Sequence, residues 1–477
     1  MRNLNHWDRL LDKTTGKWRS ALLLMALVCL TRLPLLLPLP GNLGISSDPD
    51  APGHAITAMY WHAHGDYNPS RPPGYLLSEL LNTLLFPWGW FYVNLLNTAI
   101  FALGTVWMAR ILRHYQIEGR SLVWLTFSLL PAWMVENCSI TEHTLSISCL
   151  MGGWYALLQG RYGWSGVLMG LAMAARISQT PLAIPIFALE LAQKTRSART
   201  VTVFTAAALS TVSLAWLIPT WLLMGDFSFL QAGRWQGTLI QRILGIGYDL
   251  QRAFGLQALI AMGIGLLLNL DHLRTHLQAQ PLSPFFWNSL IVFALIAYTP
   301  NKVEYALLLT PFLIPLLSEL RRAQMFFWSS TALLSFLVIA VPYVTVYEDK
   351  PVLHWIAPGK IAQELRFRQE SLLLAQRLIE NAPPRSIVFA GHSHLLRYLL
   401  VKRHLIDNAP AHTEQYGHIY LAERDVWIVQ FPDPLWIGVG GTNPQASVRF
   451  LESLIQQGRL VYYLPQMRHV YSRYPHR

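Results

Sequence analysis

The sequence predicts an α-helical, multi-spanning membrane protein with about eleven spans and a small α/β domain at its C-terminal end. The 477-residue chain is 53% hydrophobic and only 13% charged, whereas a soluble domain carries about 25% charged residues. Apolar runs of about 20 residues, the length that crosses a bilayer core, recur along the first 346 residues. From Tyr347 onward the composition changes, and short apolar strands alternate with a helical pattern.

The predicted spans follow a basic lead-in over residues 1–19, which has no clear cleavage site and so precedes a retained span. A short interfacial helix is expected over 76–87 and a polar loop over 225–253. We expect spans at about 20–40, 90–109, 121–135, 143–159, 163–175, 178–193, 200–224, 254–270, 284–299, 305–319 and 324–346. The two spans within 163–193 are short, and a single re-entrant hairpin there would leave the orientation of the others unchanged.

The charge distribution predicts the orientation. The net charge of +11 fits Lys and Arg gathered in cytoplasmic loops, rather than a nucleic-acid partner. With the N-terminus inside, the basic clusters at 110–120, 161, 194–199, 274 and 321–322 all fall on the cytoplasmic side. The loop over 41–75, later polar links and the whole C-terminal part then fall outside. The protein is therefore expected in the plasma membrane, the inner membrane if the cell is bacterial.

The C-terminal domain is expected over 347–477, after a transmembrane domain over 1–346. A helical pattern covers 359–381 and stops before Pro383 and Pro384. Strand patterns lie at 385–390, 426–431 and 460–464, and a helix is expected over 446–457. This alternation predicts a small α/β domain on the outer face.

Metal and disulfide chemistry is not indicated by the cysteines. Cys29, Cys138 and Cys149 form no ligand or pairing pattern. No cofactor is predicted, and a divalent cation is left open but not indicated.

The polar loop over 41–75 is the strongest functional candidate, because a loop this long needs a reason. It holds Asp48 and Asp50, then a helix-compatible stretch, then the turn Arg71-Pro72-Pro73-Gly74. On spacing alone, a structural role for either aspartate, as a helix N-cap or a solvated loop residue, is as well supported as a catalytic one.

This loop resembles the first outer loop of the GT-C class of glycosyltransferases that use polyprenyl-phosphate sugars, which includes protein O-mannosyltransferases and aminoarabinose transferases. The resemblance rests on Asp50, His54 and Ala58, followed by Gly65 and residues 71–75. Two positions depart from the pattern of the class. Ala51 stands where an acid is frequent, and His54 stands where Tyr is usual, which disfavours a two-carboxylate metal site.

Further motifs carry the resemblance across residues 20–345. Residues 140–145 are similar to a helix start found in this class. That helix start contains a Glu, and the corresponding residue here is Glu142. Residues 166–176 resemble a Gly-x-x-x-Gly-Leu hairpin that ends in Arg, here Arg176, with Ile177 replacing Pro. Residues 302–311 resemble a third helix start, with Glu304 where Arg is usual.

The resemblance implies an inverting hexosyl- or pentosyltransferase. A carboxylate takes the proton of the acceptor as it attacks the sugar, and Asp50 is the first candidate, with Asp48 in reserve. Glu142 is expected to orient the acceptor or Arg176, and cations are expected to stabilise the leaving phosphate. Each cation could instead be an interfacial residue, and Glu142 could simply favour a helix N-terminus. The expected donor-phosphate or acceptor residues are His54, Arg71, Arg176, Arg234, Arg242, Lys302, Glu304 and Tyr305.

The expected partners are a polyprenyl-phosphate-linked sugar, a lipid, glycan or protein acceptor, and membrane lipids, but no nucleic acid. Two other functions stay open at this point: a transporter or flippase of lipid-linked sugars, and a polysaccharide ligase. A transporter would place polar residues at the middle of the bilayer and show paired broken helices. The residues do not follow that pattern.

Overall fold

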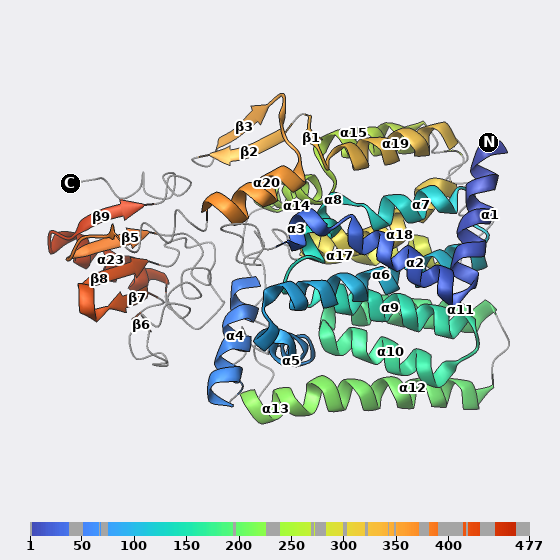
Figure 1. Ribbon diagram of the computed structural model, residues 1–477, viewed down its shortest axis with the longest axis horizontal. Coiled ribbons are helices and arrows are strands. Elements are labelled where there is room, and N and C mark those ends of the chain that lie inside the picture. Colours follow the sequence, from blue (N-terminus) through green and yellow to red (C-terminus); the bar gives the residue numbers. More distant parts are fainter. Residues whose placement is uncertain are drawn as a thin grey trace.

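The computed structural model describes residues 2–37, 51–65, 67, 75–193, 197–225, 239–268, 271, 283–298, 303–319, 323–341, 343–347, 350–371, 381–389, 414–415, 418–429 and 444–463. These residues form a long helical body with three small sheets toward one end (Figure 1). The helices are α1 (Arg2–Gly16), α2 (Trp18–Leu30), α3 (Leu33–Leu36), α4 (Ala51–His64), α5 (Leu76–Leu85), α6 (Trp90–His114), α7 (Arg120–Ser128), α8 (Pro131–Glu136), α9 (His143–Leu158), α10 (Tyr162–Ala175), α11 (Thr180–Gln193), α12 (Ala198–Val212), α13 (Ile218–Met224), α14 (Leu239–Phe254), α15 (Leu256–Leu267), α17 (Pro284–Tyr298), α18 (Val303–Glu319), α19 (Ala323–Ser335), α20 (Lys360–Arg366) and α23 (Pro444–Gln456).

Helices α6, α9, α10 and α12 lie side by side and form one wall of the body (Figure 1). Glycines let two of them approach closely. A Cβ atom on Gly166 would lie 2.4 Å from the carbonyl oxygen of Phe204, and one on Gly170 would lie 2.8 Å from that of Ala208. The Gly-x-x-x-Gly pattern of α10 is therefore a packing surface for α12, which is the usual use of small residues at this spacing in membranes.

Two helices are long and apolar enough to cross a membrane: Trp90–His114, and Ala198–Leu222, which runs through a π-helical turn. A third candidate joins Arg242–Phe254 to Leu256–Leu267, with a bend of 103° between them. Four shorter apolar helices lie at Trp18–Leu30, Tyr162–Ala175, Pro284–Tyr298 and Glu304–Ser318. The predominantly helical fold is confirmed, but eleven spans are not.

Breaks within the expected spans account for part of this difference. The first expected span breaks at Thr31 and Arg32, before the short helix α3. The span expected over 121–135 is divided into α7 and α8, because Pro131 keeps the residue before it out of the helical conformation.

Two expectations about secondary structure are wrong. The loop expected over 225–253 becomes helical at Leu239, where apolar residues begin to recur at helical spacing in α14. The span expected over 324–346 ends at Ser335, because the β-branched residues that follow favour strands, β1 (Ile339–Ala340) and β2 (Tyr343–Tyr347). These strands pair with β4 (Ala357–Pro358) and β3 (Lys350–His354).

The C-terminal sheet confirms the predicted α/β pattern. Its strand order is β6-β7-β8-β5-β9. Strand β5 (Ser386–Phe389) pairs in parallel with β8 (Val426–Val429) and β9 (Leu460–Tyr463), and α23 connects these last two. Leu451 and Leu454 of α23 pack on the sheet. The antiparallel strands β6 (Glu414–Gln415) and β7 (His418–Leu421) were not expected, and the domain boundary at residue 346 stays a prediction.

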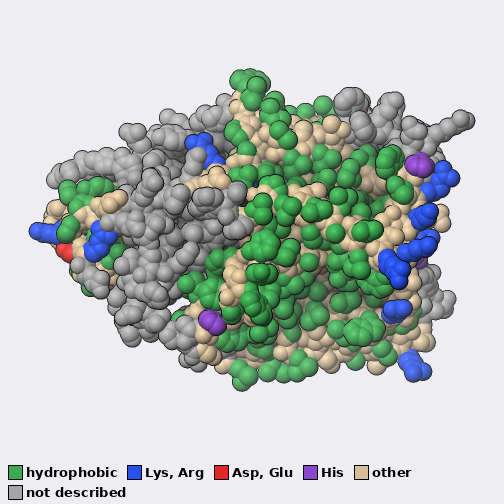
Figure 2. All heavy atoms as spheres, in the orientation of Figure 1, with side chains coloured by type: hydrophobic (Ala, Val, Ile, Leu, Met, Phe, Trp, Pro, Cys, Tyr) green, Lys and Arg blue, Asp and Glu red, His purple; other side chains and the backbone are tan. Residues whose placement is uncertain are grey.

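The described surface is polarised along the long axis of the molecule. Figure 2 shows Lys and Arg gathered at the end that carries α1, with a broad apolar surface beside it. The C-terminal sheet lies toward the opposite end (Figure 1). Helices α9 and α10 run between these ends, and α9 begins at the end that faces the sheet.

One buried arginine fastens α20 to the helical body. Arg368, just beyond α20, is fully buried and pairs with Glu364, with 2.8 Å between Nε and Oε1. Its Nη1 donates to the carbonyl oxygen of Leu35 at 2.9 Å, and Nη2 donates to that of Cys138 at 3.1 Å. The second carbonyl belongs to the link between α8 and α9, which carries Glu142.

Candidate functional site

A buried cluster of ionisable side chains joins α4, α5 and the start of α9. His54 lies in the first turn of α4 and is fully buried. Its Nε2 is 3.0 Å from Oε2 of Glu142, and its Nδ1 is 3.2 Å from Oε1 of Glu79. The imidazole ring therefore bridges two buried carboxylates from two other helices.

Arg176 continues the cluster on the other side of Glu142. Its Nη1 donates to Oε1 of Glu142 at 2.6 Å, and its Nε donates to Oγ of Ser178 at 3.1 Å. The guanidinium also contacts the ring of His143, and its carbon lies 5.2 Å from the centre of the Tyr305 ring. Glu142 is thus held between two basic groups that come from distant parts of the chain.

Local backbone geometry explains how these side chains meet. Helix α10 ends before Arg176, whose extended backbone (φ −155°, ψ 112°) separates α10 from the short 3₁₀ turn Ile177–Gln179. Glu142 is the N-cap residue of α9, where a negative charge is favoured by the helix dipole. The breaks at the ends of two neighbouring helices therefore bring a carboxylate and a guanidinium together.

Glu79 is a second centre of contacts, and no role for it was predicted. Besides His54, its carboxylate accepts a hydrogen bond from the Tyr67 hydroxyl and a long one, 3.4 Å, from the backbone N–H of Tyr75. Its interactions connect α4, α5 and the segment between them. The signal that could have found it is a single acid in the run Leu-Leu-Ser-Glu-Leu-Leu, since a charge on an apolar helix needs a partner.

Two more residues of the cluster were missed by sequence reasoning. Glu136, at the end of α8, lies 3.6 Å from Nε2 of His143 at the start of α9. Both side chains are buried and flank the link that carries Glu142. Glu304 is also buried and acts electrostatically on Arg176. The described cluster therefore holds Glu79, Glu136, Glu142, Glu304, His54, His143 and Arg176.

The two carboxylates determine the charge of His54. Burial by itself disfavours the charged ring, but the hydrogen bonds and negative charges of Glu142 and Glu79 outweigh it and raise the pKa of His54 to about 10. At neutral pH the ring is therefore an imidazolium, and both its nitrogens face carboxylates. In that state the ring links the carboxylates of Glu142 and Glu79.

The structure brings five predicted residues into or beside this cluster: His54, Glu142, Arg176, Glu304 and Tyr305. Arg242 lies in the first turn of α14 and takes part in none of the cluster contacts described above. The remaining predicted residues lie outside the described residues: Asp48, Asp50, Arg71, Arg234 and Lys302. Their expected roles stay predictions.

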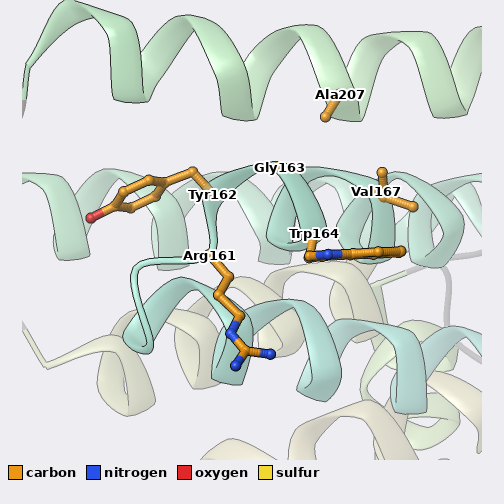
Figure 3. A pocket seen from close by; sticks show the side chains of 6 residues that line it. All are labelled: Arg161, Tyr162, Gly163, Trp164, Val167 and Ala207. Carbon is orange, nitrogen blue, oxygen red and sulfur yellow. The ribbon is translucent and has the colours of Figure 1, made fainter.

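No metal-binding group of side chains coincides with the cluster in the part of the chain that the structure describes. There, no three His, Cys, Asp or Glu side chains are grouped so as to hold a metal ion. An open groove of about 590 Å³ lies at the other end of α10 and faces Ala207 of α12. Figure 3 shows Trp164 and Val167 along this groove and the Arg161 side chain pointing away from Ala207. This groove is separate from the cluster, because Arg176 follows the opposite end of α10.

No protein-family model matches this chain, and no curated protein sequence is significantly similar to it.

Proposed function

We propose that the chain is an integral membrane glycosyltransferase of the GT-C type, with about eleven spans. It would transfer a sugar from a polyprenyl-phosphate carrier to a lipid, glycan or protein acceptor at the outer face of the membrane. The observation that carries the proposal is the meeting of His54, Glu142 and Arg176 in one buried cluster. These residues come from three separate motifs on which the resemblance rests.

The proposed reaction balances with groups of this chain. The acceptor O–H or N–H gives its proton to the carboxylate of Asp50 while the acceptor atom attacks the anomeric carbon. The bond between that carbon and the phosphate oxygen breaks, and the polyprenyl phosphate leaves with the electron pair. A single displacement of this kind inverts the anomeric configuration.

The cluster supports a positioning role in this reaction. Asp50 directly precedes α4, and His54 in the first turn of α4 is held by Glu142 and Glu79. The cluster would therefore fix the start of α4 relative to α9. Arg176 already donates to Glu142 and Ser178. We therefore assign the leaving phosphate to the other predicted cations: Arg71, Arg234, Arg242 and Lys302.

The proposal is tested by mass spectrometry of lipids, glycans and proteins from cells that lack the gene and carry either the wild type or a variant. Asp50→Asn should abolish the product that carries one added sugar, while Asp48→Asn, at the reserve candidate, should retain it. The opposite pattern would move the role of general base to Asp48. Full product formation by Asp50→Asn at normal protein abundance would remove the catalytic assignment. If the chain moves a lipid-linked sugar across the membrane and forms no glycosylated product, it is a transporter instead.

A further inference from the structure

The N-terminal helix α1 lies across the direction of the helical body. Figure 1 shows α1 at the end of the molecule, crossing the line of α6, α9, α10 and α12, and α2 turning back along them. The turn falls at Lys17, between Gly16 and Trp18. If the body crosses a bilayer along its helices, α1 lies parallel to the membrane surface, as interfacial amphipathic helices do.

The acidic side chains of α1 point inward and fasten it to α7. The Asp8 carboxylate accepts hydrogen bonds from the backbone N–H groups of Gly119 and Ser121, at 3.1 Å and 2.9 Å. Asp12 forms a two-point ion pair with Arg120, at 3.0 Å and 2.6 Å. These bonds fix α1 in its orientation and satisfy the start of α7.

The outward side of α1 and of the turn after it is basic and aromatic. Lys13, Lys17 and Arg19 are exposed there, and Trp7 and Trp18 are 58% and 60% exposed. In membrane proteins, tryptophans at such positions lie at the headgroup level, and cations beside them attract acidic lipids. Glu118, next to the Gly119 that bonds Asp8, is an exposed carboxylate beside this group of cations.

We propose that this surface binds the headgroups of anionic phospholipids in the leaflet at the α1 end. The basic side chains face the lipid phosphates, and Trp7 and Trp18 enter the interface beside them. The occupant is argued from charge complementarity, from the orientation of α1 and from the continuity of Trp18 with the exposed leucines of α2, such as Leu22 and Leu23. The inference does not depend on the transferase reaction.

The test uses the purified full chain in a neutral detergent. Short-chain phosphatidylglycerol or phosphatidylcholine is titrated in, and the thermal unfolding midpoint is recorded, since a ligand of the folded state raises this midpoint. The wild type should be stabilised by phosphatidylglycerol at much lower concentration than by phosphatidylcholine, and high salt should reduce the difference.

The test variant is the triple substitution Lys13→Gln, Lys17→Gln and Arg19→Gln. Its half-saturating phosphatidylglycerol concentration should rise on the order of 100-fold, because each of the three cations near an anionic surface contributes roughly a factor of five. The control replaces three exposed arginines elsewhere, Arg366, Arg385 and Arg449, by Gln, and should respond like the wild type. The proposal is overturned if the wild type does not prefer phosphatidylglycerol, if the test variant keeps the full preference, or if the control loses it equally.

Discussion

The Nε2 atom of His54 lies 3.0 Å from Oε2 of Glu142, although 88 positions separate the two residues in the sequence. Both side chains are fully buried. A buried ion pair is weak evidence of net stabilisation, but removing one partner is costly because the other charge stays buried. This contact therefore gives the sharpest predictions about the cluster.

His54→Asn should lower the free energy of unfolding by about 3–5 kcal/mol, because Glu79 and Glu142 lose the cation between them. The control is His62→Asn, on the exposed side of the same helix, which should change it by about 0.5 kcal/mol or less. Thermal unfolding of the purified proteins in one detergent measures both. Equal midpoints for the two variants would contradict the bridging role of His54.

The pH dependence of the stability should also reveal the interaction of His54 with Glu79 and Glu142. The pKa of His54 is raised from 6.5 to about 10, so its contribution is complete below about pH 6.5 and is lost as the pH rises through 10. The wild type should therefore lose stability relative to His54→Asn between these limits. Unfolding midpoints of the two proteins from pH 6 to 10.5 measure this difference, and a constant difference would show that His54 does not titrate as described.

Arg368→Met should destabilise the protein by about 3–5 kcal/mol, since it leaves the carboxylate of Glu364 buried without its partner and removes two bonds to backbone carbonyls. Arg366→Met, two residues earlier and exposed, is the matched control. If the link to Cys138 also positions Glu142, the proposed transferase activity per folded molecule should fall in Arg368→Met alone. Full activity would limit Arg368 to a structural role.

Gly166→Ala should disrupt the contact between α10 and α12, because the new Cβ would lie 2.4 Å from a backbone oxygen. Overpacking of this kind costs about 1–3 kcal/mol. Gly163→Ala is the control on the same helix, where the nearest atom is a side-chain methyl group at 3.7 Å and the better helix propensity of Ala should make the change neutral or favourable. Unfolding midpoints that fall equally in both variants would contradict this helix contact.

Local patterns in the sequence predicted much of the secondary structure. The helix starts near 76, 90, 143 and 162 and the strands β5, β8 and β9 agree with expectation. The motifs also selected His54, Glu142 and Arg176, which the structure brings together. The positions of proline and glycine, the spacing of apolar residues and isolated charges are local signals in the sequence. The helix starts, the strands and the choice of these three residues follow from such signals.

The sequence by itself therefore determined the helical class, the C-terminal α/β pattern and several members of the polar cluster. Only the tertiary structure decided that Glu79, Glu136 and His143 belong to the same cluster, and that Arg368 joins α20 to Leu35 and Cys138. These contacts depend on which helix ends meet in space. A buried charge shows in the sequence only that it needs a partner, whereas the packing of distant helices decides which partner it finds.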